Sequence, residues 1–167
     1  MTDISDRDRD IHGKARNARP RDQLGRPLPR GQIGVPPWPE NLTLTPEKSL
    51  STAQALLDRG RPFQAHEVLE TAWKSAPAAD RGLWKGLAQL AVGVTHAARG
   101  NLPGADALLR RGREALRSYQ DSAPHHIDAS GLSEWATRSL QRVAAADDHP
   151  IIISAPRLCR TNTPDQL

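Results

Sequence analysis

The stretch that most limits what this chain can fold into is residues 81–99. The segment from Leu83 to Ala98 is apolar apart from a few polar residues, which are Lys85, Gln89, Thr95 and His96. A run of that length with those interruptions is typical of a buried helix and too polar for a membrane span. Gly82, Gly86 and Gly93 each lower helix propensity by up to ~1 kcal/mol relative to alanine. A helix that keeps these glycines is expected to need close neighbours, so we place it in the middle of a bundle.

Start and stop signals divide residues 45–146 into five helical segments. Thr45-Pro46-Glu47 combines a hydroxyl N-cap, a first-turn proline and a first-turn acid, and Gly60 and Gly100 are typical helix ends. β-Branched and aromatic residues are scarce, with only 4% aromatic, which disfavours a sheet. We predict an all-α protein, a compact orthogonal bundle of about five helices, at residues 45–59, 61–76, 81–99, 101–119 and 130–146.

An internal repeat underlies part of this pattern. Shifted by 40 positions, Arg59-Gly60 falls on Arg99-Gly100, Ala65 on Ala105 and Leu69 on Leu109. Each copy predicts a helix, a glycine stop, a short turn and a second helix, which resembles the hairpin of tetratricopeptide (TPR) arrays. Two copies are too few for a solenoid, so we predict a bundle built on two TPR-like hairpins. The alternative is that helical hairpins share composition by chance.

Both ends of the chain differ from this domain. Residues 1–44 are rich in proline, glycine and arginine, which predicts an extended or disordered arm, with some docking near residues 33–44 through Ile33, Val35 and Trp38. Removing residues 1–35 is expected to leave the thermal midpoint nearly unchanged. Residues 147–167 are predicted to form a tail that lies extended on the bundle at 151–153 and is disordered beyond.

Charge and cysteine content restrict the classes of function. The net charge of +4 and the basic residues within 14–30 allow weak contact with nucleic acid, but that segment has no interleaved aromatic residues. Cys159 is the only cysteine, so the sequence contains neither an intramolecular disulfide nor a cysteine-based zinc site. The N-terminus lacks an apolar leader, and we predict a cytoplasmic protein without membrane contact. His125-His126 is a weak metal signal in a loop.

One segment, residues 63–74, carries the candidate chemistry. His66, Leu69, Glu70 and Trp73 occupy one face of the predicted helix, and Glu67 lies beside them. On the apolar helix 81–99, Gln89 and His96 share a face and are expected to be too buried to meet bulk water. Because unsatisfied buried polar groups cost ~1–3 kcal/mol each, we predict a polar cluster with Trp73 as an apolar wall. Its other members are His66, Glu70, Gln89 and His96.

Three interpretations of this cluster remain open. It can be a structural hydrogen-bond network. His66, Glu70 and His96 could bind a divalent metal, although the pattern is HExxE and not the HExxH of zinc proteases, and no cofactor is established. It could also line a pocket for a small polar ligand, with a carboxylate as general base, although no paired nucleophile is evident. Our first hypothesis is a non-catalytic module that binds a small ligand or protein partner, and the alternative is a metal-dependent, hydrolytic enzyme.

A family resemblance extends over residues 47–120. It is carried by Pro62-Phe63, His66-Glu67-Val68-Leu69-Glu70 and Trp73, by Gly86-Leu87-Ala88-Gln89-Leu90-Ala91, and by His96, Arg99-Gly100-Asn101 and Gly104-Ala105. This combination resembles domain-of-unknown-function family 309, and the arginine-rich residues 14–29 look like the leader of its actinobacterial-type members. The resemblance implies a small all-helical bundle and no established activity. The positions that match its motif are His66, Glu67, Glu70, Trp73, Gln89, His96, Asn101 and Gly104.

Overall fold

The computed structural model describes residues 19–39 and 41–161 of the chain. Within them lie five α-helices and two short 3-10 helices, and the only strand-like pairings are isolated bridges. The all-α prediction is therefore confirmed. The helices are α1 (Pro46–Asp58), α2 (Pro62–Ser75), α3 (Arg81–Ala98), α4 (Leu102–Leu116) and α5 (Ala129–Ala144), with η1 (Arg117–Tyr119) and η2 (Pro124–His126) between the last two.

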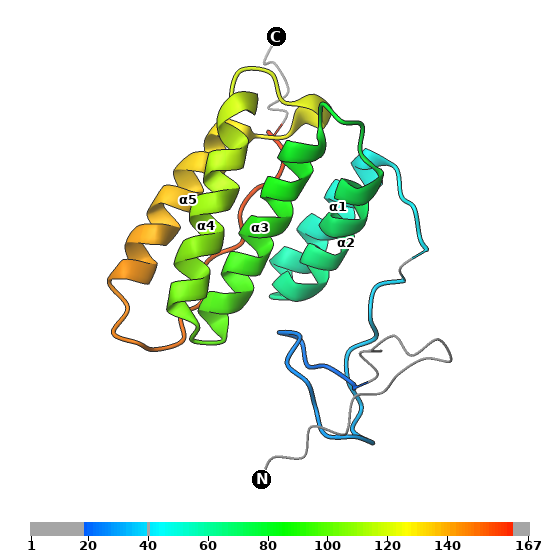
Figure 1. The fold of residues 1–167 in the computed structure, drawn as a ribbon, viewed down its shortest axis with the longest axis vertical. Coiled ribbons are helices and arrows are strands. Elements are labelled where there is room, and N and C mark those ends of the chain that lie inside the picture. The colour runs from blue at the N-terminus through cyan, green and yellow to red at the C-terminus, as the bar shows by residue number, and fades with distance from the viewer. Residues whose placement is uncertain (1–18, 40, 162–167) are drawn as a thin grey trace.

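Each helix packs against the next one along the chain. This includes α4 and α5, although the η1–η2 connection separates them in sequence. Figure 1 shows α3 between α2 and α4. The long axes of the helices are roughly aligned, whereas the sequence predicted an orthogonal bundle. The inner position of α3 agrees with its burial, since Leu83, Leu87, Leu90 and Ala91 are each at most 1% exposed. Among the described residues, no helix is long and apolar enough to cross a membrane.

The glycines of α3 lie where α4 approaches. A Cβ built on Gly93 would lie 2.8 Å from Cγ of Leu109, closer than side chains ordinarily pack. A Cβ on Gly82 would meet only the Tyr119 side chain, with the hydroxyl oxygen nearest at 3.0 Å. The expectation of close contact is confirmed for Gly93, where α4 is the neighbour, whereas Gly82 is exposed and meets only Tyr119 of η1.

The two hairpins close with the same backbone motif. Gly60 and Gly100 have φ of +71° and +80°. Arg61 N–H donates to the Leu56 carbonyl and Asn101 N–H donates to the His96 carbonyl, both at 2.9 Å. This is the Schellman ending, in which a left-handed glycine reverses the chain. The repeated positions Ala65 and Ala105 are both completely buried, so the sequence repeat corresponds to two hairpins with equivalent turns.

The described part of the N-terminal arm before residue 40 contains no helix, and residues 19–39 fold into a double loop against the helices instead of being disordered. Arg21 bridges to both Pro27 and Val35. Asp22 accepts the backbone N–H of Leu24 through Oδ1 at 2.9 Å and pairs with Arg26 at 2.7 Å. Ile33 is fully exposed and does not dock, whereas Trp38 packs against the core. Residues 1–18 of the predicted arm lie outside the described residues.

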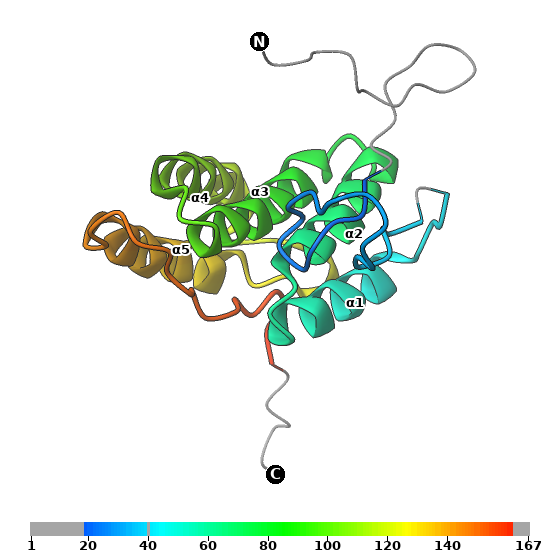
Figure 2. The same cartoon turned by 90° about the horizontal axis from the view of Figure 1, so that it is seen from below.

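The C-terminal segment also differs from expectation. Ile153 is buried, as predicted for an extended segment on the bundle, but the chain continues in contact with it through Leu158, which is 2% exposed. Gln54 of α1 holds this segment by accepting the Leu158 N–H at 2.9 Å and donating to the Pro156 carbonyl at 3.0 Å. Figure 2 shows the segment running between α5 and α1. The prediction of disorder after residue 153 is wrong as far as residue 161.

Candidate functional site

A shared polar strip runs along the junction of α2 and α3, which we call the polar seam. At one end, Lys85 Nζ lies 5.4 Å from the centre of the Trp73 ring. At the other end, Arg99 Cζ lies 5.7 Å from the centre of the Phe63 ring. Because the two helices are antiparallel, these contacts fix their register, and the predicted residues of α2 and α3 fall between them. The seam comprises Phe63, His66, Glu70, Trp73, Lys85, Gln89, His96 and Arg99.

On the α2 side of the seam, three ionisable side chains follow one another at intervals of one helical turn. His66 Nε2 lies 3.4 Å from Glu70 Oε2, and Lys74 Nζ lies 3.0 Å from Glu70 Oε1. The His66 and Glu70 side chains are 23% and 33% exposed, so a ligand in solvent can reach the pair. Burial lowers the pKa of His66, and the negative charge of Glu70 opposes this only in part. His66 Nδ1 is buried and makes no hydrogen bond of normal geometry with a described residue.

On the α3 side, His96 is held by the start of the next helix. Asn101 caps α4 by accepting the Gly104 N–H through Oδ1 at 3.1 Å, which leaves its NH₂ group to face His96 Nδ1 at 3.1 Å. The amide can only donate there, so Nδ1 accepts and the neutral imidazole carries its proton on Nε2. Burial, followed by the charge of Arg99, lowers the pKa of His96, which agrees with a neutral ring.

The predicted hydrogen-bonded cluster does not form across the seam. His96 bonds Asn101, and no hydrogen bond joins it to His66 or Glu70 within the described chain. Gln89 and His96 are half-buried, so the expectation that they are shielded from water is wrong. The reason is the position of α3. It packs against α2 and α4, but its face from Lys85 to Arg99 is not fully covered by either helix. Its side chains can therefore be solvated.

The metal-binding interpretation finds no complete ligand set. Over the part of the chain that the structure describes, no three His, Cys, Asp or Glu side chains converge as metal ligands. His66 and Glu70 remain neighbours, while His96 is oriented by Asn101. The arrangement of these residues favours hydrogen bonding and ion pairing over metal coordination.

Glu67 has a role that the sequence did not predict. Its side chain binds the N-terminal arm. Its Oε2 accepts the Trp38 backbone N–H at 3.3 Å, and Gln64 Nε2 donates to the Pro36 carbonyl at 3.4 Å. Burial raises the pKa of Glu67, against the lowering effects of the Trp38 N–H and of Arg21. Thus side chains of α2 bind the backbone groups of an extended, proline-containing segment.

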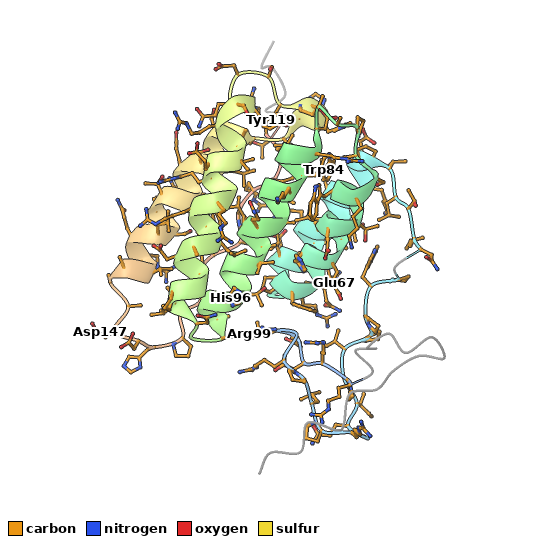
Figure 3. All side chains as sticks on the ribbon, viewed as in Figure 1. Glu67, Trp84, His96, Arg99, Tyr119 and Asp147 are labelled. Carbon is orange, nitrogen blue, oxygen red and sulfur yellow. The ribbon has the colours of Figure 1, made fainter. Side chains whose placement is uncertain are left out.

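The arm also covers Phe63 at the end of the seam. Arg21 Cζ lies 5.9 Å from the ring centre, on which Arg99 also packs, and a Cβ on Gly25 would lie 2.4 Å from the ring. Arg99 donates through Nε to the Leu24 carbonyl at 2.7 Å. Figure 3 shows Arg99 and His96 at the end of α3 that faces the arm. The sequence signal for this docking was the glycine at position 25. In the structure its φ is +70°, a value that only glycine adopts easily.

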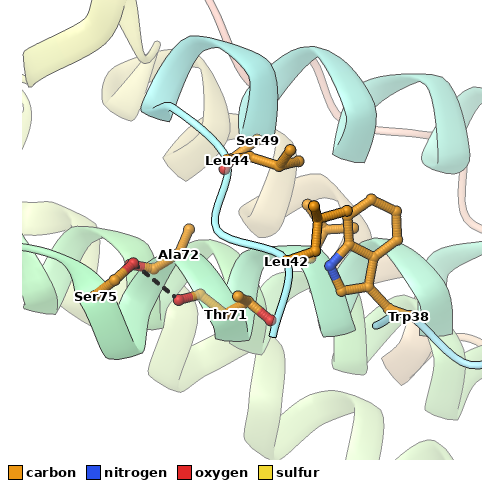
Figure 4. A pocket seen from close by; sticks show the side chains of 8 residues that line it. Trp38, Leu42, Leu44, Ser49, Thr71, Ala72 and Ser75 are labelled. Atoms are coloured by element: carbon orange, nitrogen blue, oxygen red, sulfur yellow. Dashed lines mark hydrogen bonds between the residues drawn. The ribbon is translucent and has the colours of Figure 1, made fainter. Parts of the chain in front are cut away.

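The linker that follows Trp38 packs along the same helix. Trp38, Leu42 and Leu44 enclose a recess with Val68, Thr71 and Ala72 of α2, as Figure 4 shows. This recess is too narrow for a water molecule, and Trp38 Nε1 has no hydrogen-bond partner there among the described residues. Thr71 and Ser75 donate their hydroxyls to backbone carbonyls one turn earlier. These hydroxyls are therefore structural and offer no activated nucleophile.

Comparison with known families finds a match to part of the chain. The model of the domain of unknown function DUF309 matches residues 50–108, from α1 into α4. This range contains the whole polar seam, and the chain resembles that family over it. No curated protein and no solved structure matches the chain.

Proposed function

We propose that this chain is a non-catalytic helical binding module of the cytoplasm, and that the polar seam is its recognition surface. The supporting observation is the half-exposed His66–Glu70 pair, which lies between the two cation–π contacts at Trp73 and Phe63. A strip of this kind offers an imidazole, a carboxylate and an aromatic wall to one partner. Aromatic residues and arginine are enriched at recognition surfaces, and a few placed polar groups give such surfaces their specificity.

A protein partner with an extended segment suits this surface better than a small molecule. The neighbouring face of α2 already holds residues 36–38 by side-chain bonds to their backbone. TPR-like hairpins, which we propose for α1–α2 and α3–α4, present helix faces that can receive such segments. The metal-dependent alternative built on His66, Glu70 and His96 has less support, because Asn101 engages the third residue.

Site-specific crosslinking of the full chain tests the proposal. Lys74 is 67% exposed at the edge of the seam, so a photoreactive amino acid in its place should crosslink a defined protein partner in cells. The same amino acid at Glu134, 75% exposed on α5, is the control. We expect a product specific to position 74 that disappears when Glu70→Ala is added. Identical products from both positions would refute the proposal.

Elemental analysis tests the alternative separately. The purified full chain is expected to contain far less than one equivalent of zinc, iron or manganese. A stoichiometric metal that is lost on His66→Ala would show instead that the seam is a metal site.

A further inference from the structure

A second hollow lies on the other side of the molecule's first helix, away from the polar seam. It is open to solvent, has a volume of about 430 Å³, and is lined by residues of α1, of the turn at η2 and of the segment 157–161. We call it the C-terminal hollow. Its volume falls within the range of small-molecule sites, about 300–1,000 Å³. The resemblance to DUF309 ends at residue 108, before two of these three walls.

The turn at this hollow has an unusual backbone. His125 and His126 are consecutive non-glycine residues with φ of +58° and +59°, in the left-handed region that L side chains rarely adopt. Such conformations persist where the surroundings impose them and are concentrated at functional sites. Here the Arg160 N–H donates to the His126 carbonyl at 2.9 Å. Both histidines line the hollow.

His125 is fixed further by its side chain. Its Nδ1 lies 3.2 Å from Glu47 Oε1, and its ring centre lies 6.1 Å from that of Trp84. The carboxylate of Glu47 is thereby paired. Gln54 is also fully used, because it binds Asp58 and the backbone of residues 156 and 158. These two lining residues build the wall of the hollow and leave recognition to others.

The free donors of the hollow belong to two arginines. Arg157 and Arg160 are 71% and 56% exposed, and their carboxylate neighbours Asp58 and Asp128 are 3.7 and 3.8 Å away. Those separations exceed a hydrogen bond, so the guanidinium groups keep donors for another acceptor. The lining carries two arginines, Arg157 and Arg160, against one carboxylate, that of Glu47. Planar guanidinium groups favour carboxylate or phosphate oxygens.

The floor of the hollow is apolar. Leu50 of α1 and Leu158 of the C-terminal segment are 3% and 2% exposed, and both line it. We propose that the C-terminal hollow binds a small organic anion with a short apolar chain. The anionic group lies against Arg157 and Arg160, and the chain lies against the two leucines. This site is independent of the function proposed for the seam.

The test uses the full chain and three matched probes: hexanoate, hexylammonium and 1-hexanol. Binding is measured by calorimetry and located by backbone NMR shifts. We expect hexanoate to bind at least roughly tenfold more tightly than the other probes, because charge-assisted hydrogen bonds contribute about 1.5–3 kcal/mol. The shifts should fall at residues 47–54, 125–128 and 157–161. Equal binding of hexanoate and hexanol, no hexanoate binding, or shifts elsewhere would overturn the proposal.

A pair of double variants separates recognition from folding. Arg157→Gln with Arg160→Gln should weaken hexanoate binding roughly tenfold or more. Asp58→Asn with Asp128→Asn removes the same ion pairs but keeps both arginines, and the new amide oxygen at position 128 can still accept the Gly131 N–H that Asp128 caps. This control should bind hexanoate at least as well as the wild type. If both variants lose binding equally, the arginines act only through the structure and the proposal fails.

Discussion

Gly86 of α3 and Gly112 of α4 face each other at the closest approach between the two central helices. A Cβ on Gly112 would lie 3.0 Å from the Gly86 carbonyl oxygen, and a Cβ on Gly86 would lie 3.3 Å from that of Gly112. Both residues are buried. Part of the obstruction on each side is backbone, which side-chain shifts cannot relieve, and the rest is the Leu90 side chain at Gly112 and the Ala115 methyl group at Gly86. The pair therefore sets the distance between α3 and α4.

Gly112→Ala should consequently destabilise the protein. The new methyl group would also lie 2.7 Å from Leu90 Cδ2. Overpacking costs about 1–3 kcal/mol, and the better helix propensity of alanine returns up to ~1 kcal/mol. We expect a net loss of about 1–2 kcal/mol in the free energy of unfolding, measured by urea denaturation.

The control is Gly82→Ala in the same helix bundle. There the new methyl group would meet only the Tyr119 side chain and no backbone, with the hydroxyl oxygen nearest at 3.0 Å. Its stability should stay within about 0.5 kcal/mol of the wild type. A Gly112→Ala protein as stable as this control would contradict the close-packing argument.

The contact of the arm with Phe63 leads to a second prediction. Phe63→Ala removes the ring that Arg21, Arg99 and Gly25 contact. Since the ring is half-buried, we expect a loss of about 1–3 kcal/mol, below the range for fully buried phenylalanine. Trypsin should then cleave after Arg21 faster than in the wild type. Unchanged cleavage would show that the arm does not depend on this ring.

The same contacts revise the effect of truncation. Deleting residues 1–35 removes the groups that pack on Phe63 and Arg99, so the thermal midpoint should fall by several degrees for a loss of ~1 kcal/mol or more. The sequence prediction was a negligible change. Glu67→Gln, which keeps an acceptor for the Trp38 N–H, should leave the midpoint close to that of the wild type.

What could be predicted from the sequence follows from local periodicity. Glycine and proline punctuation located the helices, and the repeat located both hairpin turns. Gln89 and His96 were predicted to share one face of the helix at residues 81–99, because helical spacing alone determines which residues share a face. The hydrogen bonds of this face were not predictable, since Asn101 can reach His96 only after the chain has turned back at Gly100.

The unpredicted features all depend on tertiary contacts. Docking of residues 20–28 needs Phe63 and Arg99 to come together from different helices. The left-handed pair His125-His126 has none of the glycine or asparagine that usually signals such a turn. The nucleic-acid prediction for residues 14–30 stays a prediction. Its described arginines include Arg21, which packs on Phe63, and Arg26, which pairs with Asp22, and residues 14–18 lie outside the described chain.

The lowered pKa values of His66 and His96 predict how stability depends on pH. Burial is the first cause for both, so each imidazole takes up a proton less readily in the folded state than its ordinary value of 6.5 indicates. Below about pH 6.5 the unfolded chain binds more protons than the folded one, and stability falls as pH decreases until the folded pKa is passed. The maximum slope is ~1.4 kcal/mol per pH unit for each histidine.

Urea denaturation at pH 7.5, 6.5 and 5.5 measures this dependence. The double variant His66→Gln with His96→Gln should lose less stability over the interval than the wild type, whatever its stability at pH 7.5. Parallel curves for the two proteins would show that neither imidazole is kept neutral by the fold. Glu67, whose pKa is raised, contributes equally to both proteins and cancels from the comparison.

The Asn101–His96 contact gives the most specific test of the seam. Asn101→Asp keeps the cap on α4, because aspartate caps as well as asparagine. It also replaces the amide donor near His96 Nδ1 by a carboxylate oxygen, where the present separation is 3.1 Å. An acceptor there favours a proton on Nδ1, so the pKa of His96 should rise, as measured by NMR titration of the ring. Asn101→Ser, which retains a cap without the charge, should raise it much less. If both variants shift the pKa equally, burial and Arg99 alone control His96, and Asn101 has no part in setting its tautomer.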